Sequence, residues 1–150
     1  MPDYYDLHFK EYFEKTASLD PSSFLEPILK FLPEKAVIID IGCGSGRDMD
    51  WFKSKGFLPF GLEKSSGMAK LAREKSGCEV IEGDFLVHDF SKYIVDAAII
   101  SASLVHQPHD LLPSILQRIK TAIKNQGLIY LSLKYGNGEK TDNLGRKFYL

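Results

Sequence analysis

The chain has 150 residues, 44% of them hydrophobic, and a formal net charge of −1 at pH 7. This length and composition are typical of one globular domain, so we expect a single domain over residues 1–150. The lack of a basic balance argues against a nucleic-acid partner, and no apolar stretch approaches the ~20 residues that a membrane-spanning helix needs. A cytoplasmic location is expected, because the first residues lack signal-peptide features and Cys43 and Cys78 have no CxxC spacing.

Two helices are expected before the first strand. The first covers about 14 residues near the N-terminus, where Leu7, Tyr12 and Phe13 are interspersed with charged residues. The second begins at Asp20-Pro21, because an acidic cap followed by proline is a typical helix start.

Residues 37–48, with the sequence VIIDIGCGSGRD, are the most informative segment. A continuous apolar run that stops in a glycine-rich turn predicts a buried parallel strand, and the glycines allow backbone N–H groups to approach a ligand. The dinucleotide-binding fingerprint has its third glycine at the position that Arg47 occupies here. The third glycine of this chain is Gly46, one residue earlier, which argues against a dinucleotide.

The order Asp-x-Gly-x-Gly-x-Gly at the end of this strand resembles motif I of the class I S-adenosylmethionine-dependent methyltransferases. The resemblance implies a turn that passes over the methionine part of the cofactor, S-adenosyl-L-methionine. An ordinary strand-to-helix turn is the alternative. The cofactor-binding residues that we assign to this segment are Asp40, Gly42, Cys43, Gly44, Gly46 and Arg47.

The next expected strand, residues 57–63, ends in an acid. A carboxylate at the tip of the second strand, roughly 20 residues beyond the glycine turn, accepts hydrogen bonds from ribose hydroxyls in dinucleotide folds. We therefore assign Glu63 to the ribose and group Lys64 with it; the alternative for Glu63 is a solvated acid at a strand end. Pro59 lacks the N–H that a central strand needs, so we expect a bulge there or a strand that begins at Phe60.

Two further strand ends complete the predicted cofactor site. After a short third strand, the resemblance places Asp84 at the adenine amino group and Phe85 on the adenine ring, although Phe85 is equally well explained as core. The fourth strand ends in the segment 101–106, which resembles the SxLxH loop of small-molecule methyltransferases, and its first residue, Ser101, is assigned to the cofactor. Methyltransferases that act on nucleic-acid bases or on protein glutamine amides commonly carry an Asn/Asp-Pro-Pro-Tyr tetrad after strand four. This sequence has no such tetrad, so it resembles the methyltransferases of small molecules.

His106 is the candidate general base for an acceptor that must lose a proton. A hydrogen-bonded loop histidine is the preferred alternative, because methyl transfer mainly requires that the nucleophile be held close to the methyl carbon. Tyr5 and Tyr12 resemble N-terminal tyrosines that cover the cofactor in related small-molecule methyltransferases, and we assign Tyr12 to the cofactor. No metal site is expected, because His106 and His109 have no third ligand nearby in the sequence.

Strands and helices alternate along the chain, which predicts an α/β, Rossmann-like, doubly wound fold: a three-layer αβα sandwich around a mostly parallel sheet. The family resemblance implies the strand order 3-2-1-4-5 for this sheet. We expect Ser65 to cap a helix over residues 66–75 and a last helix to close at Gly127. A fifth strand follows at 128–133. The apolar stripe of the last helix consists of Leu112, Ile115, Leu116, Ile119 and Ile123.

The family usually has seven strands, and five are expected here, so the fifth strand would have an open edge. Two copies could pair through this edge, the chain could be a fragment of a longer protein, or the segment from Tyr135 to Leu150 could cover the edge. The basic residues of the C-terminal part are interpreted as solvated surface. They are Lys134, Lys140, Arg146 and Lys147.

The favoured prediction is S-adenosylmethionine-dependent methyl transfer to a small-molecule acceptor. One alternative is a non-catalytic cofactor-binding or interaction module, which would keep the glycine turn and Glu63 but transfer nothing. A nicotinamide dehydrogenase is less favoured, because the third glycine is misplaced and no Tyr-x-x-x-Lys pair occurs at a useful place. The identity of the acceptor stays open.

Overall fold

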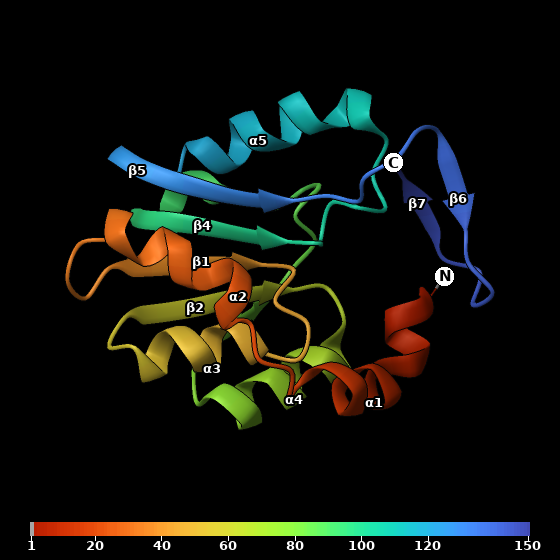
Figure 1. Cartoon of the computed structure of the whole chain (residues 1–150), viewed down its shortest axis with the longest axis horizontal. Helices are drawn as coiled ribbons and strands as arrows, with labels where there is room; N and C mark the ends of the chain where they lie inside the picture. Colours follow the sequence, from red (N-terminus) through yellow and green to blue (C-terminus); the bar gives the residue numbers. More distant parts are fainter. Residues whose placement is uncertain (1) are drawn as a thin grey trace.

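A computed structural model describes residues 2–150 and shows a three-layer α/β fold (Figure 1). Within these residues, five parallel strands form one sheet in the order β3-β2-β1-β4-β5. The fold class and the strand order predicted from the sequence are therefore confirmed. The strands are β1 (Val37–Ile41), β2 (Leu58–Glu63), β3 (Val80–Glu82), β4 (Val95–Ser101) and β5 (Ile123–Ser132).

Helices cover both faces of the sheet, because neighbouring residues of each buried strand point to opposite faces. On one face, Ile38 packs with Leu25 of α2 and Phe52 of α3. On the other face, Ile39 packs with Ile115 of α5. The helices are α1 (Tyr4–Thr16), α2 (Ser22–Leu25), α3 (Arg47–Ser54), α4 (Ser66–Ser76) and α5 (Leu112–Lys120), with 3-10 helices η1 (Glu26–Phe31), η2 (Phe90–Lys92) and η3 (His109–Leu111).

The predicted helix that closes at Gly127 is wrong, because α5 ends at Lys120 and Ile123 already pairs with β4. Ile119 and Ile123 are four residues apart, a spacing that fits one face of a helix. Ile123 fits equally well at the start of a strand that contains an irregularity. The register of β5 shifts along β4, and Gln126 has a φ of +66° in this stretch. A Cβ on Gly127 would lie 2.8 Å from the carbonyl oxygen of Asp96 in β4, so this glycine allows β5 to pass close to β4.

Pro59 lies in β2 without a bulge, in register with Ile38, so the expected bulge or later strand start is wrong. Alternate residues of a strand donate to opposite neighbours. The Leu58 N–H donates to Ala36 on the β1 side, and the Gly61 N–H donates to Glu79 on the β3 side. The nitrogen of Pro59 therefore faces the β3 side, ahead of the first residue of β2 that pairs with β3. The missing N–H costs no ladder bond there.

The C-terminal residues form a small antiparallel hairpin of β6 (Glu139–Thr141) and β7 (Lys147–Tyr149). The hairpin lies at the carboxyl ends of the sheet strands, on the same side as the N-terminus of α1 (Figure 1). The Tyr149 N–H donates to the carbonyl oxygen of Val105, 2.9 Å away. The C-terminal segment therefore covers the strand ends and not the edge of β5, and within residues 2–150 β5 pairs only with β4.

Candidate functional site

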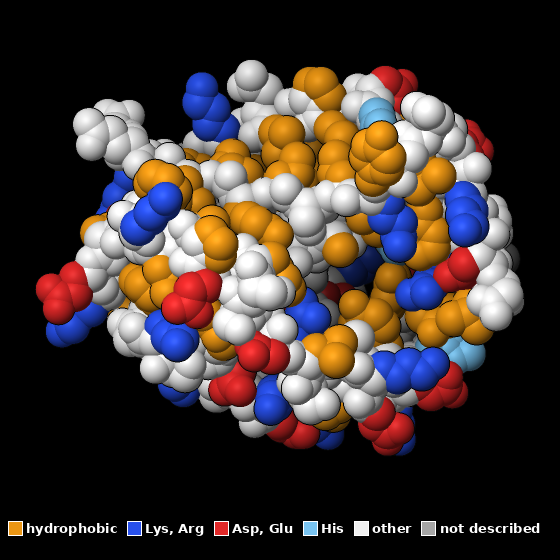
Figure 2. Space-filling model, viewed as in Figure 1, with side chains coloured by type: hydrophobic (Ala, Val, Ile, Leu, Met, Phe, Trp, Pro, Cys, Tyr) orange, Lys and Arg blue, Asp and Glu red, His pale blue; other side chains and the backbone are white. Residues whose placement is uncertain are grey.

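A cavity of about 370 Å³ opens at the carboxyl ends of the strands, between α1, the loops after the first four strands, and the hairpin. Its volume is in the range of small-molecule sites, which is roughly 300–1,000 Å³. Figure 2 shows a hollow on this face, with hydrophobic side chains and Lys or Arg side chains around it. The predicted site residues that line the cavity are Tyr12, Gly42, Gly44, Glu63, Lys64, Asp84, Phe85, Ser101 and His106.

The glycine turn after β1 is bonded to the end of β2. The N–H groups of Gly42 and Cys43 donate to the carbonyl oxygen of Leu62, at 2.8 and 3.1 Å. Gly42, Gly44 and Gly46 all have positive φ, which favours glycine. A Cβ on Gly44 would come 3.4 Å from the ring of Tyr12, so the glycine keeps the space between the turn and Tyr12 open.

Glu63 joins the two segments that the sequence singles out. Its Oε2 accepts from the Gly44 N–H at 2.9 Å, and its Oε1 accepts from the Ser65 N–H at 3.3 Å. Burial raises the pKa of Glu63, and these two backbone donors oppose the rise. A carboxylate has about four lone-pair sites, so both oxygens can accept further hydrogen bonds.

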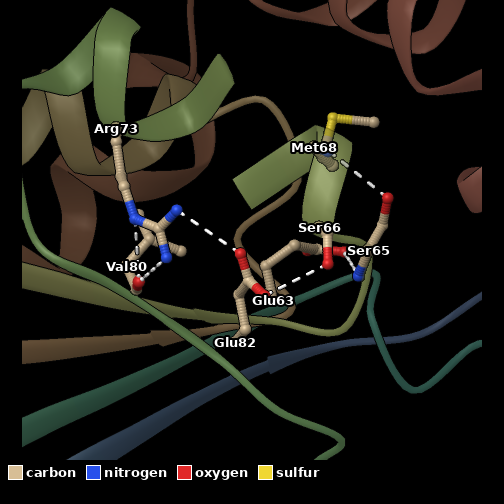
Figure 3. A network of polar contacts seen from close by, with 7 residues as sticks. All are labelled: Glu63, Ser65, Ser66, Met68, Arg73, Val80 and Glu82. Carbon is tan, nitrogen blue, oxygen red and sulfur yellow. Dashed lines mark hydrogen bonds and ion pairs between the residues drawn. The ribbon is translucent and has the colours of Figure 1, made fainter. Parts of the chain in front are cut away.

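The start of α4 is held beside Glu63 by a polar network (Figure 3). The Ser65 hydroxyl accepts from the Met68 N–H at 3.3 Å and caps the helix, as predicted. The Ser66 hydroxyl donates to Glu82 at 3.1 Å, and Arg73 donates to Glu82 and to the carbonyl oxygen of Val80. The loop that presents Glu63 and Lys64 is thereby connected to both β2 and β3.

Four predicted cofactor residues do not line the cavity: Asp40, Cys43, Gly46 and Arg47. The Asp40 side chain is buried, its Oδ2 has no hydrogen-bond partner within residues 2–150, and burial together with the nearby Asp48 raises its pKa well above the ordinary value. Arg47 pairs with Asp48 at 2.8 Å. A Cβ on Gly46 would lie 3.0 Å from the carbonyl oxygen of Ala72 in α4. Their contacts with a cofactor stay predictions.

The third-strand residues line the other side of the cavity. Asp84 accepts from the Leu86 N–H at 2.9 Å, and the Lys64 ammonium lies 3.9 Å from its carboxylate. Phe85 lines the cavity and also packs against the core of the α5 face, so it fits both of its sequence interpretations.

His106 is held by two segments that are distant in the sequence. The Tyr5 hydroxyl lies 2.9 Å from its Nε2, and the carbonyl oxygen of Lys147 lies 2.7 Å from its Nδ1. Both ring nitrogens of His106 are therefore hydrogen-bonded, and its role as a general base stays a prediction. Burial raises the pKa of Tyr5, with the Arg146 guanidinium opposing the rise, and burial raises the pKa of Tyr12 to about 12.

The prediction that Arg146 is part of a solvated surface is wrong. Its guanidinium lies 4.8 Å from the centre of the Tyr4 ring, pairs with Asp142 at 2.9 Å and lines the cavity. No local pattern distinguishes it from the other basic residues of the C-terminal part, because its partner ring lies at the opposite end of the chain.

In the part of the chain that the structure describes, no group of three or more His, Cys, Asp or Glu side chains is placed to hold a metal ion. No helix in residues 2–150 is both long and apolar enough to cross a membrane. Cys43 and Cys78 are free thiols.

The family described as "Methyltransferase domain" matches residues 38–127, which is more than half of the chain. The chain belongs to this family. The matched residues include the glycine turn, Glu63 and Asp84. The predicted membership of the methyltransferases is therefore confirmed. A comparison with curated proteins found no match.

Solved methyltransferase structures have the same fold. A TehB-like SAM-dependent methyltransferase from Corynebacterium glutamicum matches with a TM-score of 0.71 at 20% identity, over 93% of this chain and 76% of its own. The DhpI–SAH complex matches with a TM-score of 0.66 at 16% identity, over 97% and 74%. Magnesium protoporphyrin IX methyltransferase from Synechocystis PCC 6803, with bound SAH, matches with a TM-score of 0.60 at 15% identity, over 83% and 57%. The sheet of this chain is the class I methyltransferase sheet.

Proposed function

We propose that this domain binds S-adenosyl-L-methionine and transfers its methyl group to a small-molecule acceptor. The observation that carries the proposal is the 2.9 Å hydrogen bond between the Gly44 N–H and the Glu63 carboxylate in the cavity wall. It joins the motif I turn to the acid at the end of β2, the two features that a cofactor with a ribose requires together. The presence of SAH, the demethylated form of the cofactor, in two structures of the same fold supports this assignment.

The residues of the cavity fit the proposed cofactor. Glu63 retains lone pairs for the ribose hydroxyls, and Asp84 presents a carboxylate for the adenine amino group. Phe85 offers an apolar surface to the adenine ring. Gly44 leaves open the space below Tyr12 that a Cβ would narrow, and the methionine part would pass there.

S-adenosylmethionine supplies a methyl group on a sulfonium, and transfer leaves S-adenosylhomocysteine and the methylated acceptor. The chain mainly has to hold the acceptor in line with the methyl carbon and to exclude water. The position of α1 and the hairpin at the mouth of the cavity suits that task. An acceptor that carries a proton on its reacting atom must also lose that proton.

The size of the cavity and the near-neutral net charge favour a small-molecule acceptor over a nucleic acid. A non-catalytic module that binds the cofactor and transfers nothing is the second candidate.

A single domain over residues 1–150 and a cytoplasmic location also stay predictions.

Titration calorimetry tests the cofactor assignment. We expect S-adenosylmethionine to bind with a Kd of roughly micromolar order and NAD to give no heat. Glu63→Ala should weaken binding by roughly 1–3 kcal/mol, because the ribose hydroxyls would lose their acceptor. Glu74→Ala on the exposed side of α4 is the matched control and should bind as the wild type does. Heat from NAD and none from S-adenosylmethionine would contradict the proposal.

A further inference from the structure

The directions of the two hydrogen bonds on His106 follow from the chemistry of its partners. The carbonyl oxygen of Lys147 can only accept, so the Nδ1 of His106 carries the hydrogen of that 2.7 Å bond. The neutral ring then has its lone pair on Nε2, which accepts the hydroxyl hydrogen of Tyr5 across 2.9 Å. His106 therefore has no free nitrogen with which to contact an acceptor directly.

Tyr5 is the member of the pair that can meet an acceptor. Both side chains line the cavity, but only Tyr5 keeps a free acceptor site: its hydrogen points to His106, and the Arg146 guanidinium takes one of the two lone pairs of its oxygen. Burial raises the pKa of Tyr5, which keeps the hydroxyl protonated near neutral pH and able to donate. An oxygen whose hydrogen is already donated is placed to accept a second hydrogen bond from a ligand.

The charged groups near the pair come from the hairpin and from Asp3, which precedes α1, lines the cavity and adds to the rise in the pKa of Tyr5. Arg146 pairs with Asp142 at 2.9 Å, and the Lys147 ammonium pairs with Glu139 at 2.7 Å. Each cation thus has its own carboxylate partner. Within residues 2–150, no carboxylate is hydrogen-bonded to His106.

We propose that Tyr5 and His106 form a proton relay, and that the acceptor carries a hydroxyl or a thiol on its reacting atom. As the oxygen or sulfur of the acceptor bonds to the methyl carbon and the carbon–sulfur bond of the donor breaks, the acceptor proton passes to the Tyr5 oxygen. The Tyr5 proton passes to Nε2 of His106, and after the product leaves, the imidazolium returns this proton to the Tyr5 oxygen, which releases its other proton to water in the cavity. Tyr5 is the catalytic residue, and His106 acts through it. This inference rests on the proposed function.

Nitrogen-15 NMR of the histidine side chains tests the relay without cofactor or acceptor. The His106 signals are identified by their loss in His106→Gln. We expect the neutral ring to carry its hydrogen on Nδ1. A hydrogen on Nε2 would overturn the relay, because that nitrogen could not then take a proton from Tyr5. This result stands whether or not S-adenosylmethionine binds, so it separates failure of the relay from failure of the proposed function.

An acceptor panel tests the chemistry, with S-adenosylhomocysteine release as the readout. It contains phenols and alkyl thiols, which carry a proton on the reacting atom, and tertiary amines and thioethers, which do not. We expect release of S-adenosylhomocysteine only with phenols or thiols. In Tyr5→Phe and His106→Gln the rate of release should fall by about 100-fold or more, while the affinity for S-adenosylhomocysteine stays unchanged.

Tyr135→Phe and His109→Gln are matched controls, because both residues are exposed and lie outside the cavity wall. Both should keep the wild-type rate. Release with tertiary amines or thioethers, no release with any phenol or thiol while the cofactor binds, or unchanged release in Tyr5→Phe would each overturn the proposal.

Discussion

Asp40 sits at the centre of the sheet in β1 with a buried carboxyl group whose Oδ2 lacks a partner within residues 2–150. Burial raises its pKa well above the ordinary value, and the carboxylate of Asp48 adds to the rise. The folded chain therefore holds the Asp40 proton more tightly than the unfolded chain does. Folding takes up a proton at any pH between the two pKa values, so the free energy of unfolding falls as the pH rises through that window.

Asp40→Asn should raise the free energy of unfolding of the cofactor-free chain by about 1–3 kcal/mol near pH 7, because the amide does not ionise in its buried site. The difference should shrink as the pH falls toward the ordinary carboxyl range, where the wild-type group is protonated in both states. Urea denaturation at several pH values measures it. Asp110→Asn, on an exposed acid, should show no such trend, and a destabilised Asp40→Asn at pH 7 would refute the argument.

Gly46 shows why a motif glycine need not face the ligand. Its φ is +82°, and a Cβ would lie 3.0 Å from the backbone of α4. Gly46→Ala should cost about 1–2 kcal/mol for the left-handed backbone and about 1–3 kcal/mol more for the clash. Gly56→Ala is the matched control, since its φ is +91° and its Cβ would meet open space, so it should cost only the backbone part. Equal losses in urea denaturation would mean that the contact with α4 is relieved at no cost.

At the scale of elements, the β6–β7 hairpin links two other parts of the cavity mouth, the loop after β4 and α1. It bonds to Val105 and His106 in the loop after β4, and Arg146 stacks on Tyr4 of α1. It forms no ladder with the main sheet within residues 2–150. The hairpin is thus expected to shape the site more than the fold.

A chain shortened to end at Gly138 should therefore keep the sheet. Its free energy of unfolding should be lower by about 1.5–3 kcal/mol, mainly because the surface around Phe148 becomes exposed. Circular dichroism should be close to that of the full chain, while S-adenosylhomocysteine should stabilise the shortened chain less against heat. The free energy of unfolding of Phe148→Ala should lie between those of the full chain and the shortened chain. Loss of the circular dichroism spectrum on shortening would show that the hairpin is required for folding.

At the scale of the whole molecule, the outer edge of β5 has no partner strand in the described part of the chain. An apolar edge of this kind favours pairing with another strand. We expect two copies to associate through β5 around a two-fold axis.

Sedimentation over a range of concentrations measures this association. Ile129→Lys places a charge on β5, where the side chain is 37% exposed, and should shift the chain toward monomer. Leu144→Lys in the hairpin, 49% exposed, should leave the association unchanged. A wild-type chain that stays monomeric at millimolar concentration would exclude the dimer.

The sequence by itself determined the buried first strand, the glycine turn and the acid at the end of β2, while the sheet order was implied by the family resemblance. These features are local: an apolar run, a turn that only glycine adopts easily, and an acid at a strand end keep their meaning wherever the rest of the chain lies. Gly44 and Glu63 meet because the carboxyl ends of adjacent parallel strands share one edge of the sheet.

Only the tertiary structure decided how Pro59 is tolerated, where β5 begins and how His106 is held, because each of these features depends on a neighbour that is distant in the sequence. Pro59 is tolerated because β3 pairs only from Gly61 onward. Ile123 is in a strand because β4 lies beside it, although its spacing also fits a helix. Tyr5 and His106 are 101 residues apart, and the Lys147 carbonyl that orients the ring is 41 residues further on. Such contacts have no local pattern, since they form only when α1, the β4 loop and the hairpin pack together.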